Sequence, residues 1–492
     1  MSLRSQFSLF TLPIVVMLPL VTGACSSDDE LPDPDTSSGG QGSGATGNGT
    51  GGTFGPGSGG TAAGGSSSGG AAMNSGGMLG GATGGTANDG SGGAAADGSG
   101  GEGPGPDAAA WGKVEKPSAA CEVGEMPSFG SLTANPKLPD PFKKMDGTRI
   151  TDKSEWLCRR QEIIKQQYAF SWGEKPVPPE GATTGTVSTS SITVSVATDE
   201  GSTQFTLSVN MNGATAPAPA IISYGAGAPA PNGVARITFT AVEQSGGSGA
   251  KNGPFYDVYG SDHAAGYLTA QAWQISRVLD VLEQDPSVID PQRVGLTGCS
   301  RNGKGAFVGG ALDNRVALTI PVESGLGGTV GLRLVETIGG NEWPYHGISY
   351  VRWMSEVALG PFAKANNAAG DDTAKLPVDM HEMMALIAPR GLYIVDNPSI
   401  SNLDPGAAWV TGNVGKMIFE ALGVGDHFAY QGAGGDHCMW RSQYQASLDA
   451  MVDKFLKGND AASTGNVATD LANKPDPADH IDWDVPTLAG SL

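Results

Sequence analysis

A serine in a tight, glycine-rich turn is the residue best suited to covalent chemistry. The apolar run Val294 to Thr297 leads into the sequence GCSRNGKGA at residues 298–306, and we expect a helix from Gly303. A sharp strand-to-helix turn can expose a nucleophilic serine, and it needs glycines because it leaves little room for side chains. The spacing departs from the common G-x-S-x-G pattern, since Asn302 stands two residues after the serine. We predict that Ser300 is a nucleophile; the alternative is a serine that caps the helix.

A histidine that could take the serine proton must be sought further along the chain. Where a nucleophile sits on such a turn, the catalytic residues follow in the order serine, acid, histidine. Three candidates, His346 in an irregular loop, His381 on an expected helix and His427 at a strand start, are better explained as structural. The remaining one, His437, lies in the sequence GGDHC at residues 434–438, between the last core strand and the last helix. We therefore predict His437 as the general base.

Three carboxylates could orient this histidine. Glu323 ends the run TIPV at residues 319–322, Asp396 ends the run Leu392 to Val395, and Asp404 lies in the loop beyond. Position at a strand end favours Asp396, because many hydrolases of this architecture place the acid after the later strand. The residues alone do not decide among the three.

The elements that would position these residues alternate between strands and helices. Short β-branched runs follow one another with helices between them, and an expected helix at Tyr267 to Gln284 precedes the serine strand. Such alternation predicts a mostly parallel sheet covered on both faces, with catalytic groups at the carboxyl ends of its strands. The fold class is therefore α/β, an α/β-hydrolase three-layer sandwich with a mostly parallel central sheet. Other expected elements are helices at 154–170, 378–387, 414–422 and 441–456, and strands at 191–198, 204–210, 218–224, 235–241, 293–298, 317–322, 390–395 and 427–431.

The segment at residues 298–306 resembles the G-C-S-R-x-G-K-G-A signature of glucuronoyl esterases, carbohydrate esterase family 15. These enzymes cleave 4-O-methyl-glucuronate esters between xylan and lignin. The likeness extends from Cys121 to about Lys457 and includes PVESG at 321–325, LIAPRG at 386–391 and GDHC at 435–438. It implies a serine esterase that acts through an acyl-enzyme on glucuronoxylan or another lignin-carbohydrate ester, here in a bacterial lipoprotein form.

The resemblance also implies roles for individual residues. It makes Glu323 the acid that stabilises the His437 imidazolium, gives Arg301 the role of oxyanion donor, and matches Lys304 to a residue that hydrogen-bonds uronate hydroxyls. Family members carry a sugar-stacking aromatic in the loop after the Asp396 strand. This chain has Ser-Asn-Leu at 401–403 there, so Trp343 is a substitute candidate.

Cysteine usage predicts two disulfide bonds. Of the five cysteines, four follow Cys25, an even number that is typical of disulfides in an exported protein. Three pairings of these four are possible. The resemblance favours Cys299 with Cys438, which would link the neighbours of nucleophile and base, and leaves Cys121 with Cys158.

The first part of the chain has the features of an export signal and a tether. Residues 1–25 combine a short basic start, an apolar stretch and small residues before Cys25, which resembles a lipidated lipobox cysteine. Residues 26–108 are rich in Gly, Ser, Ala and Thr and are expected to stay an unstructured linker. We expect residues 109–492 to form the catalytic domain of a monomeric, secreted or cell-surface protein. An outer-membrane lipoprotein, in which only the anchor meets the membrane, is one form of this expectation.

Charge and composition exclude several functions. The formal net charge is −21, with no run of basic residues, so nucleic-acid binding is not expected. No cofactor or metal is expected: His381-Glu382 begins like a zinc-protease helix, but no second histidine follows at the required spacing. Two alternatives to the glucuronoyl esterase remain: a broader carboxylesterase or acetyl-xylan esterase, and a non-catalytic polysaccharide-binding surface lipoprotein.

Overall fold

The computed structural model describes residues 114–116, 121–239, 251–339, 353–355 and 373–492. The chain divides into two units, residues 1–95 and 96–492, and every described residue belongs to the second. The expected leader with Cys25, the expected linker, Trp343 and His346 lie outside the described residues. No helix in the described part of the chain combines the length and apolar character needed to cross a membrane.

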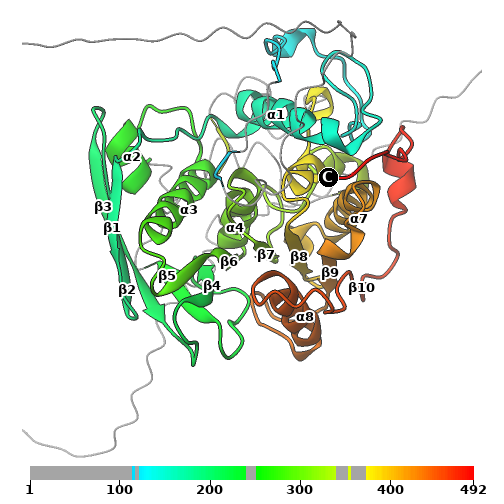
Figure 1. Cartoon of the computed structure of the whole chain (residues 1–492). Coiled ribbons are helices and arrows are strands. Elements are labelled where there is room, and N and C mark those ends of the chain that lie inside the picture. The colour runs from blue at the N-terminus through cyan, green and yellow to red at the C-terminus, as the bar shows by residue number, and fades with distance from the viewer. Residues whose placement is uncertain (1–113, 117–120, 240–250, 340–352, 356–372) are drawn as a thin grey trace, which may run out of the picture. The chain divides into compact units, whose positions relative to one another are not determined.

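The second unit is built on one 10-stranded sheet (Figure 1). Its strand order is β1-β2-β3-β5-β4-β6-β7-β8-β9-β10. The pairs from β1 to β5 in this order are antiparallel, and all pairs from β5 to β10 are parallel, which confirms the mostly parallel sheet. The strands are β1 Thr183–Val187, β2 Ser191–Ala197, β3 Ser202–Asn210, β4 Ala218–Ser223, β5 Ala235–Phe239, β6 Ile289–Cys299, β7 Leu318–Val322, β8 Gly391–Asp396, β9 Phe428–Gly432 and β10 Val467–Thr469.

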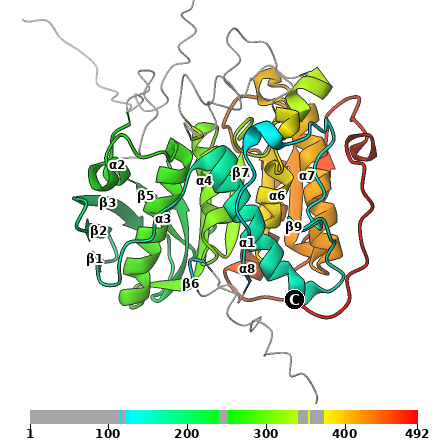
Figure 2. The same ribbon diagram turned by 90° about the horizontal axis from the view of Figure 1, so that it is seen from above.

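Helices cover both faces of the sheet (Figures 1 and 2). Along β8, Leu392 and Ile394 pack in a cluster with α1, α6 and α7, while Tyr393 and Val395 pack with α8. This alternation is the period of two that a strand imposes on its side chains, and it produces the expected three layers. The helices are α1 Trp156–Gln167, α2 Pro254–Tyr259, α3 Tyr267–Gln284, α4 Arg301–Leu312, α6 Met380–Ala385, α7 Pro405–Ala421 and α8 Gln445–Phe455.

The sequence-based elements differ from the structure mainly at the sheet edges and in one helix. Strands β1 and β10 were not predicted, because one is a mostly exposed Thr- and Gly-rich segment and the other has only 3 residues. Helix α7 begins at Pro405, whereas the sequence predicted a start at Val414. The first turns were missed because Gly406 and Gly412 give this segment a low helix propensity. The last helix begins at Gln445, after a short 3-10 turn at Ser442–Tyr444.

Candidate active site

Ser300 lies on a strained turn between β6 and α4. Its backbone adopts φ 57° and ψ −128°, a conformation that costs free energy for a residue other than glycine and that concentrates at functional sites. The Ser300 amide donates to the carbonyl oxygen of Val322 at 3.0 Å, so the turn is fixed to the end of the neighbouring strand. The Ser300 side chain makes no capping hydrogen bond to α4. This geometry is the one expected of a nucleophile on a strand-to-helix turn and argues against the alternative of a helix cap.

Two glycines make this turn sterically possible. A Cβ atom on Gly298 would lie 2.2 Å from the carbonyl oxygen of Asn302, and one on Gly303 would lie 2.6 Å from that of Val322. Both distances are far below normal contact, and backbone atoms cannot move aside easily. The glycine three residues after the serine therefore has a steric role, which explains how Asn302 can replace the glycine of the common pattern.

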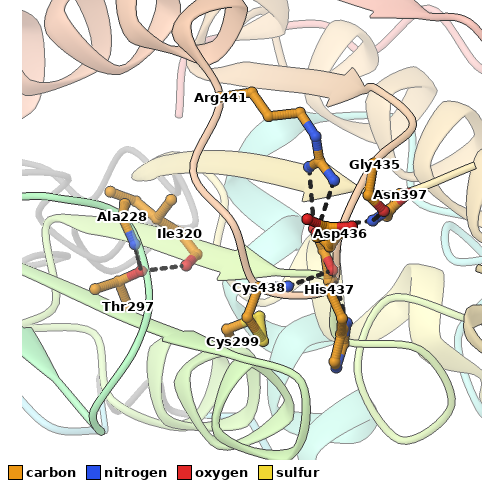
Figure 3. Close-up of a disulfide and its surroundings, with 11 residues drawn as sticks. Ala228, Thr297, Cys299, Ile320, Asn397, Gly435, Asp436, His437, Cys438 and Arg441 are labelled. Carbon is orange, nitrogen blue, oxygen red and sulfur yellow. Dashed lines mark hydrogen bonds and ion pairs between the residues drawn. A yellow bond between two sulfur atoms is a disulfide. The ribbon is translucent and has the colours of Figure 1, made fainter. Parts of the chain in front are cut away.

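Strand β6 is also tied to its neighbours just before the turn (Figure 3). The Thr297 hydroxyl donates to the carbonyl oxygen of Ile320 at 2.9 Å and accepts from the Ala228 amide at 3.0 Å. Thr297 is fully buried, so these bonds are shielded from water. They fix the strand end from which Ser300 projects.

His437 is hydrogen-bonded to Glu323. The Nδ1 atom of His437 lies 2.7 Å from the Oε2 atom of Glu323. Glu323 follows β7, is fully buried and has φ 47°, while His437 lies in the exposed loop after β9. Because Nδ1 is bonded to the carboxylate, Nε2 is the ring nitrogen available to a hydroxyl. This is the arrangement of an acid and a base in a catalytic triad.

Four donors converge on the Glu323 carboxylate. Oε2 also accepts from the Cys438 amide at 2.9 Å, and Oε1 accepts from Arg441 at 3.1 Å and Asn397 at 3.3 Å. Burial raises the pKa of Glu323, but the bonds from His437, Cys438 and Arg441 outweigh it and hold the pKa below its usual value. Glu323 is therefore ionised at neutral pH.

A disulfide joins the nucleophile turn to the histidine loop (Figure 3). Cys299 and Cys438 are bonded, with their Cα atoms 5.7 Å apart, and the second disulfide joins Cys121 and Cys158. This is the pairing that the resemblance implies. Since Ser300 follows one cysteine and His437 precedes the other, the bond keeps the two in adjoining positions.

The other two acid candidates have different partners. Asp396 is buried and accepts a hydrogen bond of 2.8 Å from the Tyr430 hydroxyl, and burial raises its pKa to about 6. Asp404 is buried in a left-handed conformation at the start of α7. Among the contacts of the described residues, only Glu323 of the three bonds to His437. Strand-end position alone favoured Asp396, but the carboxylate bonded to His437 is that of Glu323, which follows β7 and turns toward the histidine at positive φ.

The residues expected to meet the substrate lie on the first turn of α4. Arg301 is exposed directly after Ser300, and Lys304 is buried one turn later. The Nζ atom of Lys304 lies 4.1 Å from the centre of the Trp353 ring, a cation–π contact. Trp353 was not singled out from the sequence, because nothing there links it to α4. Ser401 and Asn402, which replace the family aromatic, are exposed.

The remaining described histidine candidates have structural contacts. A ring nitrogen of His381 lies 2.9 Å from the carbonyl oxygen of Pro139, and His427 contacts the carbonyl oxygen of Pro389. Potential metal-ligand atoms do meet at Cys299, Glu323, His437 and Cys438, all within 4.8 Å of one another. The two sulfurs are bonded to each other and offer no thiolate, so these four residues lack the ligand set of a metal site.

Two site residues were not found from the sequence. Arg441 and Asn397 both contact Glu323. Arg441 lies outside every motif that the sequence analysis used. Asn397 directly follows Asp396, which was the more prominent candidate. In the sequence, the one sign of a role for these two residues is that each lies within a few positions of a candidate site residue.

Comparison with known proteins agrees with this geometry. The model of the family described as "Glucuronyl esterase, fungi" matches residues 194–423. A 4-O-methyl-glucuronoyl methylesterase of Hypocrea jecorina is 38% identical over 385 residues, covering 75% of this chain and 80% of the relative. One of Podospora anserina is 39% identical, covering 68% and 71%.

Solved structures give the same result. A glucuronoyl esterase variant of Sporotrichum thermophile, in complex with methyl 4-O-methyl-β-D-glucopyranuronate, matches with a TM-score of 0.69 at 36% identity, covering 75% of this chain and 100% of that one. A family 15 glucuronoyl esterase of Caldicellulosiruptor kristjansonii matches with a TM-score of 0.60 at 27% identity, covering 72% and 98%. The chain belongs to the glucuronoyl esterase family, carbohydrate esterase family 15.

Proposed function

We propose that this chain is a serine esterase that hydrolyses 4-O-methyl-glucuronoyl esters, the bonds that link glucuronoxylan to lignin alcohols. The observation that carries the proposal is the 2.7 Å bond between His437 and Glu323, in a loop that a disulfide fastens beside Ser300. The activity of relatives up to 39% identical supports the substrate class.

In the proposed reaction each of these side chains has one role. Nε2 of His437 takes the proton of the Ser300 hydroxyl as its oxygen attacks the C6 carbonyl of the uronate. Arg301 stabilises the negative charge that develops on the carbonyl oxygen, an effect usually worth about 3 kcal/mol. The bond to the alcohol then breaks, and His437 returns its proton to the leaving oxygen. Water hydrolyses the resulting acyl-enzyme by the same steps and releases the glucuronate.

The test compares the wild type with Ser300→Ala on benzyl and methyl glucuronate esters. We expect acid release by the wild type and a loss of at least about 10³-fold in kcat for the variant. Arg293→Met, which changes an exposed residue on β6, is the matched control and should keep full activity. Equal, slow rates for wild type and Ser300→Ala would contradict the proposal. Retention on xylan with no acid release by either protein would favour the non-catalytic polysaccharide-binding protein.

A broader carboxylesterase or acetyl-xylan esterase is the second candidate. The observation that favours it is the exposed Ser401-Asn402 pair at the position of the sugar-stacking aromatic. A site without that platform would hold the uronate ring less selectively, because aromatic faces contribute much of the contact area. Comparing kcat/KM on a glucuronate ester and on acetylated xylan separates the two candidates. A higher value on acetylated xylan would favour the second.

We further propose that the chain is an exported, monomeric protein anchored through a lipidated Cys25. The apolar leader before Cys25 and the two disulfides support export. Mass spectrometry of the mature N-terminus tests the anchor, with Cys25→Ser as the control. An unlipidated Cys25 in the mature protein would leave a secreted enzyme without an anchor. Sedimentation tests the monomer.

A further inference from the structure

The acid of the proposed triad is paired with a permanent cation. Arg441 Nη1 donates to Oε1 of Glu323 at 3.1 Å, while His437 and the Cys438 amide occupy Oε2. Among the described residues, Arg441 is the one lysine or arginine in ion-pair contact with Glu323. The two carboxylate oxygens of Glu323 therefore have different partners: Oε2 is bonded to His437, and Oε1 accepts from the Arg441 guanidinium.

Arg441 is held in this position by bonds on several sides. Nη1 also donates to the Tyr444 hydroxyl at 3.0 Å, and Nη2 donates to the carbonyl oxygen of Asp436 at 2.9 Å. A Cβ on Gly435 would lie 2.7 Å from the guanidinium, so a larger residue there would displace Arg441 from its present position. Figure 3 shows the Arg441 side chain reaching toward the Asp436–His437 loop. Its side chain is 11% exposed, so solvent screens the ion pair only in part.

We propose that Arg441 is a positioning residue of this active site: it directs Oε2 of Glu323 to His437 and offsets the negative charge that the imidazolium would otherwise meet. The proposal rests on the esterase function above. An uncompensated buried carboxylate stabilises the protonated imidazole, which is inactive as a base in the free enzyme. With the carboxylate neutralised by Arg441, His437 holds a proton less tightly, and activity extends to lower pH.

Other charged groups around Glu323 do not replace this cation. Asp396 and Asp404 are acids on and after β8, and Tyr444 and Asp436 carry no positive charge. On the nucleophile side, Arg301 is exposed and forms no ion pair with any described residue. Removal of Arg441 therefore leaves Glu323 in a predominantly acidic surrounding. The pKa of Glu323, which the bond from Arg441 helps to lower, should then rise, and the acidic limb of kcat/KM should move to higher pH.

The test is the pH profile of kcat/KM for Arg441→Met, Arg441→Lys and Arg293→Met. In Arg441→Met we expect the acidic limb to move up by roughly 0.5 to 1 pH unit, with a lower plateau. In Arg441→Lys the charge is kept, so the limb should stay within about 0.3 unit while kcat falls several-fold because the bond to Asp436 is lost. Arg293→Met removes an exposed cation paired with Asp290 and should leave the profile unchanged.

An NMR titration of the His437 ring in the same variants makes the test independent of substrate. If the wild type does not cleave glucuronate esters, the proposed function fails, but the titration still reports whether Arg441 lowers the proton affinity of His437. A thermal melt identifies any variant that does not fold, and Arg441→Lys then carries the test: because its charge is kept, an acidic limb that moves up by about 0.5 pH unit or more contradicts the proposal. Unchanged His437 titration in a folded Arg441→Met protein would overturn it.

Discussion

Glu323 Oε2 and His437 Nδ1 lie 2.7 Å apart, although the two residues come from strands that are not neighbours in the sheet. Strand β8 lies between β7, which delivers the acid, and β9, whose loop delivers the base. The acid crosses this gap because Glu323 has positive φ and its amide is bonded to the carbonyl oxygen of Val395 on β8, at 2.7 Å. The end of β8 therefore supports the acid without supplying it.

Replacement of Glu323 by glutamine tests this assignment. Glu323→Gln keeps the size of the side chain but removes the acceptor that fixes the His437 tautomer, so we expect kcat to fall about 10³- to 10⁴-fold. Asp396→Asn is the matched control, because Asp396 is bonded to Tyr430 instead, and its kcat should change less than about ten-fold. Steady-state rates on benzyl glucuronate measure both. A larger loss in Asp396→Asn would assign the acid to β8.

The disulfide at the active site should contribute both to stability and to rate. The disulfide between Cys299 and Cys438 closes a loop with a sequence separation of 139, compared with 37 for Cys121 and Cys158. Replacing either pair by alanine removes the corresponding loop constraint from the unfolded chain. By chain entropy the first pair should cost about 1 kcal/mol more in free energy of unfolding. It should also lower kcat about 10- to 100-fold, since reacting groups lose their alignment, whereas the second pair should change kcat less than about two-fold. Denaturant unfolding and rates check the two outcomes, and equal kcat losses would contradict them.

Gly298→Ala should disrupt the nucleophile turn. The added methyl group would lie 2.2 Å from the Asn302 carbonyl oxygen, so the backbone must shift at a cost of roughly 1 to 3 kcal/mol. Gly130→Ala is the control, because nothing lies within 4 Å of a Cβ there. We expect a lower melting temperature and a strongly reduced kcat only for Gly298→Ala. A fully active Gly298→Ala enzyme would show that the turn tolerates a side chain.

The buried Asp396 should make the protein less stable as pH rises. Its pKa of about 6, raised by burial, exceeds the ordinary value of 3.8, so the folded state holds this proton more tightly than the unfolded state. The contribution of Asp396 to stability is therefore greatest below pH 3.8 and is lost as pH rises toward 6. Asp396→Asn removes this dependence and should raise the free energy of unfolding at pH 7 by about 3 kcal/mol. Urea unfolding at pH 4 and pH 7 measures the difference between the two proteins, which should be larger at pH 7.

The sequence predicted the central part of the fold better than its edges. Helix α3 was predicted with both ends as observed, because its apolar residues recur at helical spacing and it is buried along most of its length. The edge strand β1 has a pattern of mostly exposed residues, so no hydrophobic alternation marked it. Edge strands gain stability from pairing with their neighbours, and this tertiary contribution is not visible in local sequence.

The site was predicted unevenly for a related reason. Ser300 and His437 lie in glycine-rich motifs whose local geometry is encoded in a few consecutive residues. The choice between Glu323 and Asp396 depends on which carboxylate crosses to another strand, and the contact of Arg441 depends on the folded loop. The resemblance to the family pointed to Glu323 rather than Asp396. The contact between Arg441 and Glu323 became visible only in the folded structure.

The bond between Cys299 and Cys438 also links the geometry of the active site to the redox state of its surroundings. The chain between the two cysteines includes strands β7, β8 and β9, so in the folded protein this one bond closes a loop that contains three of the parallel strands. In the reducing cytoplasm these thiols stay apart. The esterase would then reach its full alignment of Ser300 and His437 only in an oxidising compartment.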